Sequence, residues 1–257
     1  MTPPPLVLLA HGSRDPRHAA TVQALRAGVA GRRPGLRAEV AFLDFNAPRV
    51  SAALGALAAS GEREAVVLPL LLTRAFHAKT DVPAALRAAA ARLPRLTIRT
   101  AGVLGPSPLL RAALERRLTE AGVHDRASTA VVLAAAGSSD PEATAEVERL
   151  AREWQRAGGW WAVRPAYASA RGPRPAEAVT ALRTAGAPRV AVAPFALAPG
   201  RLPARIAAGS AEADTVADVL GAAPELAELV LRRYDEAVVA GRRLKGQARQ
   251  KPSLAGV

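Results

Sequence analysis

Three polar side chains in the first half of the chain stand at positions suited to chemistry. His11, Asp44 and His77 each follow a short apolar run that has the length of a buried strand. The carboxyl ends of parallel strands meet at one edge of a sheet, so we expect these side chains to gather at a single rim. Imidazole and carboxylate bind divalent metals, and neutral imidazole also accepts protons near pH 7. The pattern therefore predicts a site that binds a metal or transfers protons.

The second half of the chain repeats the first half without these groups. At a constant offset of 125 residues, the three positions are occupied by Ala136, Ser169 and Leu202. The glycines and prolines that turns require are instead identical in the two copies, since backbone geometry sets that requirement. We therefore expect one active site per chain, in a domain formed by residues 1–127, followed by a degenerate copy in residues 128–240.

The composition indicates a globular chain that is long enough for two domains. Its 257 residues are 50% hydrophobic, and the repeat favours two cores over one. The absence of cysteine excludes disulfides, thiolate metal sites and cysteine nucleophiles, which leaves histidine and carboxylate as the strong ligands. No segment reaches the roughly 18 apolar residues of a membrane span, and prolines 3–5 stand where a signal peptide needs basic residues. We expect a cytoplasmic protein without a membrane partner.

The net charge of +13 is unevenly distributed. Residues 1–127 contribute +9 and residues 241–257 contribute +5, whereas the segment between them is nearly neutral. A positive field over the half with the histidines would steer an anionic small molecule toward it. A compositional bias is the alternative, because 32 of the 35 basic residues are arginine. With 9 aromatic residues and no recognisable binding motif, we expect no nucleic-acid partner.

Strand-like runs alternate with segments of helical periodicity along both halves. The first half begins with a strand at residues 6–10 and a helix at about 18–32, and the alternation continues with strands at 37–43, 65–72 and 97–103 and helices at 48–60, 82–93 and 108–121. The second half repeats this order but is about nine residues shorter between Leu202 and Leu220, so we expect a shortened strand or helix there. The fold class is α/β, with two duplicated domains, each a parallel sheet covered by helices on both faces. The basic tail, residues 241–257, is expected to be disordered.

Three motifs carry a resemblance to a known family. They read Leu-Leu-Ala-His-Gly-Ser-Arg-Asp-Pro-Arg from Leu8, Phe-Leu-Asp-Phe-Asn-Ala-Pro from Phe42, and Val-Leu-Pro-Leu-Leu-Leu-Thr-Arg-Ala-Phe-His-Ala-Lys-Thr-Asp-Val-Pro from Val67. Over most of residues 6–120 the chain resembles the sirohydrochlorin chelatases, ATP-independent lyases that insert a divalent metal into a tetrapyrrole. It is similar to the long form of the family, in which two copies are fused, and here the second copy is degenerate.

The resemblance implies roles for particular residues. His11 and His77 would bind the metal and accept protons, and Asp44 takes the acidic position, which is often glutamate in the family. The substrate would be an anionic tetrapyrrole, and the candidates to hold its carboxylates are Ser13, Arg14, Arg74 and Lys79. No organic cofactor is implied, because the divalent metal is itself a substrate. Two imidazoles and a carboxylate suit iron(II), cobalt(II) or nickel(II), so a sirohydrochlorin ferrochelatase for siroheme and a cobaltochelatase for cobalamin both stay open.

Two other functions are weighed against metal insertion. Phosphatases with a histidine nucleophile also place His-Gly after a first strand, but they have an arginine before the histidine where this chain has Ala10. A non-catalytic carrier of a metal or a tetrapyrrole would need the same residues, and only a turnover measurement separates it from a chelatase.

The remaining histidines and the tryptophans have structural interpretations. We expect His18, on the first helix, and His124, between the halves, to lie at the surface. Trp154, Trp160 and Trp161 are expected in core packing or between the halves. If the halves pack as the two subunits of a short homodimer would, the fused chain is expected to be a monomer with one metal site.

Overall fold

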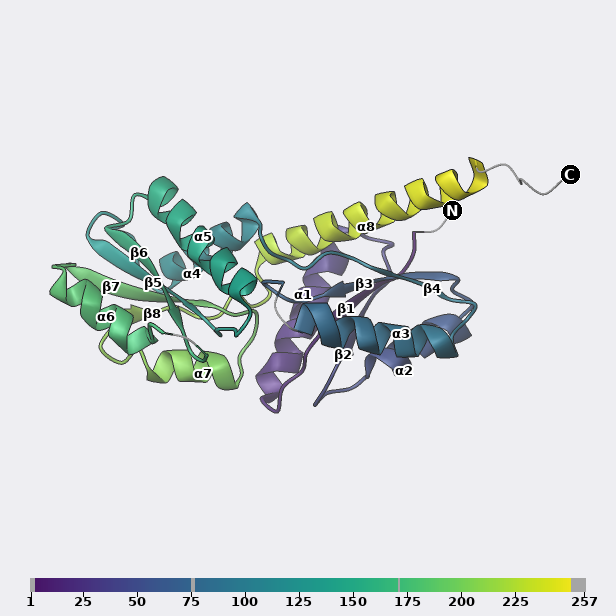
Figure 1. The fold of residues 1–257 in the computed structure, drawn as a ribbon, viewed down its shortest axis with the longest axis horizontal. Coiled ribbons are helices and arrows are strands. Elements are labelled where there is room, and N and C mark those ends of the chain that lie inside the picture. The colour runs from purple at the N-terminus through teal and green to yellow at the C-terminus, as the bar shows by residue number, and fades with distance from the viewer. Residues whose placement is uncertain (1–2, 75–76, 171, 251–257) are drawn as a thin grey trace, which may run out of the picture.

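The protein contains two four-stranded parallel sheets, each at the centre of one half of an elongated molecule (Figure 1). The computed structural model describes residues 3–74, 77–170 and 172–250, with the side chains of residues 77–78 and 244–250 outside the description. The strand order is β2-β1-β3-β4 in one sheet and β6-β5-β7-β8 in the other. The predicted α/β fold class with two duplicated parallel sheets is therefore confirmed.

The elements of the first half follow the predicted alternation. They are β1 (Leu6–Ala10), α1 (Pro16–Arg32), β2 (Ala38–Phe42), α2 (Val50–Ala59), β3 (Glu64–Pro69), the π-helical turn η1 (His77–Asp81), α3 (Val82–Arg92), β4 (Thr97–Thr100) and α4 (Pro108–Glu120). Helix α1 begins with proline in its first turn, and the Asp15 side chain caps it by accepting from the backbone N–H of Arg17. Strand β1 is apolar and buried throughout, and β3 is so after Glu64, as expected for strands covered on both faces.

The second half repeats this order with shortened late elements. They are β5 (Thr129–Ala135), α5 (Pro141–Gly158), β6 (Ala162–Tyr167), α6 (Pro175–Thr184), β7 (Arg189–Phe195), α7 (Arg201–Ala208), β8 (Thr215–Val216) and α8 (Pro224–Gln250). Helix α7 has 8 residues where α3 has 11, and β8 has 2 residues where β4 has 4. The missing residues before Leu220 are thus taken from both a helix and a strand.

The last helix of each half packs against the sheet of the other half. Helix α4 packs against β7 of the second sheet, while α8 runs back along the first sheet and packs on α1 and β3 (Figure 1). Arg233 of α8 donates hydrogen bonds to the backbone carbonyls of Val103, Leu104 and Pro106. The Tyr234 hydroxyl donates to the Pro4 carbonyl at 2.7 Å, across 230 residues of chain. One continuous apolar core results, with residues of α4 and α8 packed among those of both sheets.

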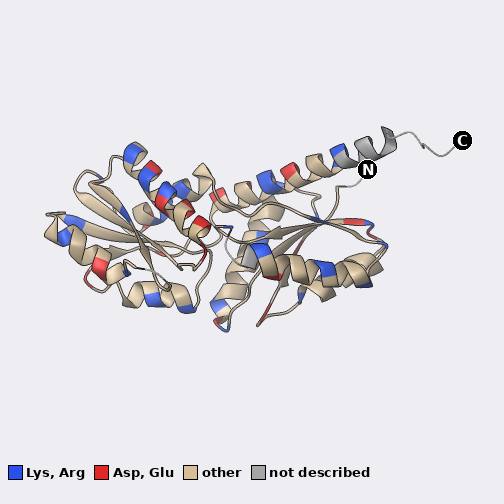
Figure 2. Ribbon diagram, viewed as in Figure 1, with Lys and Arg blue, Asp and Glu red and all other residues tan. Residues whose placement is uncertain are grey.

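The last helix corrects one prediction about the tail. Helix α8 continues through Gly241 to Gln250, whereas we expected disorder from residue 241. Gly241 is buried against Arg99, and a Cβ atom at this position would collide with the Arg99 guanidinium. Acidic and basic residues alternate along α5 and α8, which is the pattern of solvated helix faces (Figure 2). Residues 251–257 lie outside the described part of the chain.

Candidate functional site

A cavity of about 1000 Å³ lies between the halves, at the carboxyl ends of the central strands of both sheets. In the first sheet the chain continues from β1 to the strand at one edge and from β3 to the strand at the other edge. In the second sheet it leaves β5 and β7 in the same two directions. Such switch points leave a crevice beyond the strand ends, where ligands of open α/β sheets bind. Here the two crevices face one another and form a single cavity. Its volume is at the upper end of the range for small-molecule sites.

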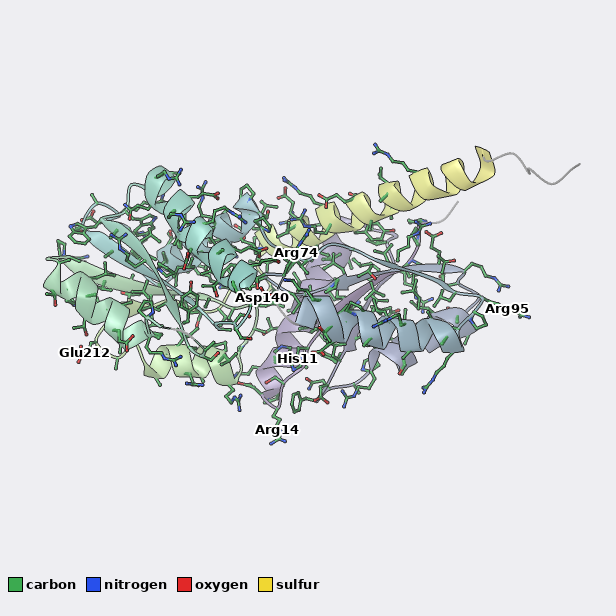
Figure 3. The ribbon with its side chains drawn as sticks, viewed as in Figure 1. His11, Arg14, Arg74, Arg95, Asp140 and Glu212 are labelled. Carbon is green, nitrogen blue, oxygen red and sulfur yellow. The ribbon has the colours of Figure 1, made fainter. Side chains whose placement is uncertain are left out.

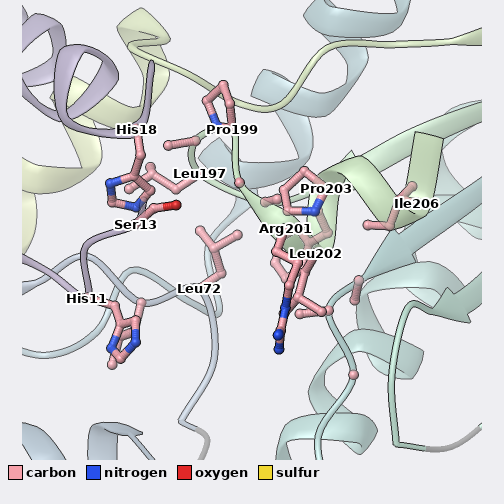
Figure 4. A pocket seen from close by; sticks show the side chains of 18 of the residues that line it. His11, Ser13, His18, Leu72, Leu197, Pro199, Arg201, Leu202, Pro203 and Ile206 are labelled. Carbon is pink, nitrogen blue, oxygen red and sulfur yellow. The ribbon is translucent and has the colours of Figure 1, made fainter. Parts of the chain in front are cut away.

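His11 lies on the wall that the first half contributes. It follows β1 directly, and Figure 4 shows it with Ser13, His18 and Leu72 on one side of the cavity. The turn that holds His11 depends on Gly12, whose φ is +96° and whose missing Cβ would lie 1.9 Å from the Asp44 carbonyl oxygen. Gly137 has the same close approach, at 2.1 Å from the Ser169 carbonyl oxygen. Both copies therefore keep the turn, and only one of them supplies an imidazole there.

Asp44 lies next to His11 in the backbone but directs its carboxylate elsewhere. Its N–H donates to the His11 carbonyl at 2.8 Å. Its carboxylate accepts from the backbone N–H of Phe45 and pairs with Arg49 at 2.9 Å, with 51% of the side chain exposed. These two contacts, the Phe45 N–H first, hold the pKa of Asp44 below its usual value, so the group is ionised at neutral pH. The side chain is not among the described residues that line the cavity.

His77 opens the π-helical turn that joins β3 to α3. Its backbone is described and its side chain is not, so its contacts lie outside the described residues. The nearby cations face the second half. Lys79 pairs with Asp140 and Glu142 of α5, both at 2.7 Å, and the Arg74 N–H donates to the Glu146 carboxylate. Neither Arg74 nor Lys79 is among the described residues that line the cavity. Arg74 lies where the halves meet (Figure 3), and the ion pairs of Lys79 place it there too.

Ser13 and Arg14, the other two predicted substrate contacts, do line the cavity. The Ser13 hydroxyl accepts from the Asp15 N–H at 3.1 Å, and Ser138 makes the equivalent bond to Asp140 at 3.0 Å. Because the copy without histidines keeps this bond, it belongs to the shared turn. Arg14 is exposed at the outer edge of the first half (Figure 3), so its guanidinium is available to an anionic group.

His18 is a cavity residue that the sequence analysis placed wrongly. It lies on α1 as predicted, but it lines the cavity and is half-buried, because the first turn of α1 faces the strand ends. Among the described residues no hydrogen-bond partner reaches its buried Nδ1 atom. Burial, and secondarily the neighbouring His11, lowers the pKa of His18, which favours neutral imidazole. The sequence held a signal for this position, since residue 18 falls in the first turn of the helix that follows the histidine loop.

Phe45 is a second cavity residue that the sequence analysis missed. It is 48% exposed and adopts a φ of +61°, which is rare for a bulky residue. Its ring meets His11 edge-on at 6.1 Å, and the Arg14 guanidinium lies 5.7 Å from its centre. The repeat partner, Ala170, has a φ of +64°, so the turn sets this backbone and the large ring is an addition of the first copy. An exposed aromatic beside a histidine in a cavity is suited to contact a flat ligand.

The second half contributes a mainly apolar wall. The strand ends and α7 of the second half bring Phe195, Leu197, Pro199, Leu202 and Pro203 to the cavity. Figure 4 shows Leu202 and Pro203 on the side opposite His11. Arg201 lies on the same side and is exposed, so this wall also carries a cation that the sequence analysis did not single out.

Tyr167 adds a hydroxyl to this apolar wall where its repeat partner, Phe42, has none. Burial raises the pKa of Tyr167 to about 12, so the hydroxyl stays protonated.

No three His, Asp or Glu side chains come together as a metal site among the side chains that the structure describes. That set does not include His77, the second predicted ligand. Trp154 and Trp160 are buried and meet edge-on at 6.0 Å, as expected for core packing. Trp161 is 36% exposed, so the same expectation was wrong for this residue. His124 is exposed, as predicted. No helix in the described part of the chain is long and apolar enough to cross a membrane.

Comparison with known proteins identifies the family. The sequence matches the model of the CbiX protein family twice, over residues 5–121 and again over residues 130–237. The chain belongs to the CbiX family. The two matches follow the internal repeat, and they confirm the resemblance found in the three motifs. Among curated relatives, the sirohydrochlorin cobaltochelatase of Priestia megaterium is 28% identical over 171 residues, and the sirohydrochlorin ferrochelatase of Bacillus subtilis (strain 168) is 27% identical over 197 residues.

The family likeness extends to the whole described fold. The structure of SirB from Bacillus subtilis with Fe3+ superposes with a TM-score of 0.79 at 25% identity, covering 91% of this chain and 95% of that one. The sequence match to the cobaltochelatase is shorter, at 65% of this chain and 56% of the relative's length. For the ferrochelatase the shares are 77% and 75%. The CbiX family member described here therefore has the full two-sheet fold.

Proposed function

We propose that this protein inserts iron(II) or cobalt(II) into sirohydrochlorin, as a step of siroheme or cobalamin biosynthesis. The observation that carries the proposal is the cavity at the paired switch points, with His11 on one wall and apolar side chains on the other. A flat macrocycle needs such a slot, since its faces are apolar and its edge is charged. The names of the relatives, a cobaltochelatase and a ferrochelatase, support the same reaction and leave the metal open.

The chemistry requires groups that hold a metal weakly and accept two pyrrole protons. Neutral imidazole does both near pH 7, and the position of His11 in the cavity wall supports this role for it. His77 is proposed as the second ligand and acceptor, because its backbone begins the turn that follows β3. Asp44 is proposed as the third ligand. It would reach the metal only by a rotation that releases Arg49, and its lowered pKa keeps it available as a carboxylate.

The substrate carboxylates need cations at the rim of the cavity. Arg14 on the first half and Arg201 on the second half line the cavity from opposite sides and are exposed. A guanidinium can grip a carboxylate with two parallel hydrogen bonds, so the pair would orient the edge of the macrocycle. Ser13 adds a hydroxyl on the same side as His11.

An anaerobic insertion assay tests the proposal. Sirohydrochlorin is supplied with iron(II), cobalt(II) or nickel(II), and the rate of insertion is measured from the absorption spectrum of the macrocycle at several enzyme concentrations. Catalysis predicts a rate that is proportional to enzyme and many turnovers per chain. A single equivalent of product, or binding without turnover, would instead identify a carrier of the metal or the tetrapyrrole.

A further inference from the structure

The loop that connects β3 to α3 has two kinds of anchor. Its first residues are fixed by the first half, since the Leu70 N–H donates to the Leu9 carbonyl at 2.8 Å and the Leu71 carbonyl accepts from the Leu104 N–H at 2.9 Å. Farther along, its contacts are with α5 of the second half. Arg74 reaches α5 through its backbone N–H, and Lys79 does so through its side chain. His77 lies between these two contacts.

Lys79 is held by two carboxylates at the start of α5. Its Nζ atom lies 2.7 Å from Asp140 Oδ2 and 2.7 Å from Glu142 Oε2. The Asp140 side chain is 16% exposed. Its other oxygen, Oδ1, caps α5 by accepting from the Glu142 N–H at 3.0 Å. The capping bond orients the Asp140 carboxylate independently of its contact with Lys79. The contact with Lys79 lowers the pKa of Asp140, so this carboxylate is ionised at neutral pH.

The repeat shows that this link is not inherited from the duplication. Asp15 caps α1 as Asp140 caps α5, but its carboxylate pairs within its own helix, with Arg17 at 2.6 Å. The position of Arg17 is occupied by Glu142 in the second copy, and the position of Lys79 is occupied by Ala204. The two copies thus differ by a matched pair of changes, an acid at the start of α5 and a base in the loop before α3. Together they link the loop before α3 in the first half to the start of α5 in the second half.

We propose that Lys79, Asp140 and Glu142 form a clamp through which the degenerate half positions the loop that carries His77. Lys79 is then a positioning residue, and it does not bind the substrate. The clamp rests on the proposed role of His77 as a metal ligand, because Lys79 lies two positions after His77 in the same helical turn. The second half supplies no ligand itself and instead holds the ligand of the first half in place.

The experiment replaces each member of the clamp. It then measures separately how the insertion rate depends on the concentration of cobalt(II) and on that of sirohydrochlorin. The variants are Lys79→Met, Asp140→Asn, which keeps the capping oxygen, Glu142→Gln, and the double variant Lys79→Met with Glu142→Gln. We expect each to raise the half-saturating cobalt(II) concentration by about threefold to tenfold, the range for exposed ion pairs, with the KM for sirohydrochlorin unchanged. The double variant should be no worse than Lys79→Met alone, because the two residues share one interaction.

A matched control and a second readout keep the result interpretable. Arg183→Met removes an ion pair of similar exposure, to Asp214 at 2.8 Å within the second half, and should leave both constants unchanged. Cobalt(II) affinity without tetrapyrrole, measured by calorimetry, should weaken in the clamp variants by the same factor. If the wild type binds cobalt(II) without turnover and the variants bind it more weakly, the proposed function fails and the clamp stands.

Two outcomes would overturn the clamp. One is a Lys79→Met variant whose KM for sirohydrochlorin rises while its cobalt(II) dependence is normal, since that identifies Lys79 as a substrate contact. The other is a set of variants with lower melting temperatures and unchanged cobalt(II) affinity, which reduces the clamp to an ordinary contact between the halves.

Discussion

His11 combines a turn that both copies share with a side chain that only one copy has. If the imidazoles are ligands and proton acceptors, His11→Ala and His77→Ala should each lower the rate of metal insertion by at least about a hundredfold. Stopped or continuous insertion assays with cobalt(II) measure this directly. His124→Ala is the control, because His124 is exposed in the segment between the halves. Near-normal turnover in either of the first two variants would remove that histidine from the site.

Phe45 is expected to contact the face of the macrocycle. Phe45→Ala should raise the KM for sirohydrochlorin by about tenfold, because the variant loses an aromatic contact worth about 1 kcal/mol and its buried area. The half-saturating cobalt(II) concentration should not change. Ala170 shows that alanine is compatible with this backbone, so the melting temperature should hold. A KM within twofold of wild type would mean that the ring only covers His11.

His18 should make the folded state sensitive to mild acid. Burial lowers its pKa in the folded protein, so below the ordinary pKa of about 6.5 the unfolded chain binds a proton more readily than the folded chain. Stability should therefore be complete above that value and fall as the pH drops through it. Urea unfolding at pH 7.5 and 5.5 should show a smaller loss in His18→Phe than in the wild type. Equal losses in both proteins would contradict the burial of a neutral imidazole.

At the scale of elements, helix α8 depends on a few long-range contacts. Arg233 is 19% exposed and donates to three backbone carbonyls of the segment after β4. Arg233→Met leaves those carbonyls without these donors, so it should lower the free energy of unfolding by about 1–3 kcal/mol. Arg232→Met is the control, since Arg232 lies on the same helix and pairs with Glu228 one turn away. Similar urea midpoints for the two variants would show that Arg233 contributes nothing beyond a surface charge.

The sequence predicts where the strands and helices lie along the chain, but it does not predict which sheet each helix packs against. Apolar runs and helical periods are local, and they locate β1, α1 and the shortened region before Leu220 to within a few residues. The exchange of α4 and α8 between the sheets is not local, because an apolar helix face has the same pattern whichever sheet it covers. The π-helical turn at His77 also escapes sequence analysis, since its residues have no periodic signal over five positions.

The site follows the same division between local and long-range information. The position of His11 after a strand, and its loss in the repeat, are enough to mark it. Residue spacing does not encode the side-chain contacts of the site. Two examples are the ion pair of Asp44 with Arg49 and the ion pair of Lys79 with Asp140 at the start of α5. His18 was placed at the surface because nothing in a single helix shows which of its turns faces the strand ends.

For the whole molecule, the exchange of helices predicts the behaviour of an isolated half. Residues 1–127 lack α8, so the face of the first sheet that includes Leu6, Leu8 and Leu68 would lose its cover, as would Leu25 of α1. A protein of these residues should dimerise, with each α4 covering the other sheet, or aggregate. The full chain should be a monomer that binds one metal. Light scattering and cobalt(II) titration measure both properties, and a monomeric, fully active first half or two equivalent metal sites would contradict this account.

The return of α8 to the first sheet also sets a schedule for synthesis on the ribosome. The strands of the first sheet leave the exit tunnel early, but the helix that closes their apolar face begins at Pro224. Domains made in sequence order usually fold as they emerge. This chain must instead keep its first sheet open until the residues of α8, from Pro224 onward, have been translated. The nascent protein is therefore expected to engage holding chaperones early, and rare codons placed before α8 would lengthen its most vulnerable interval.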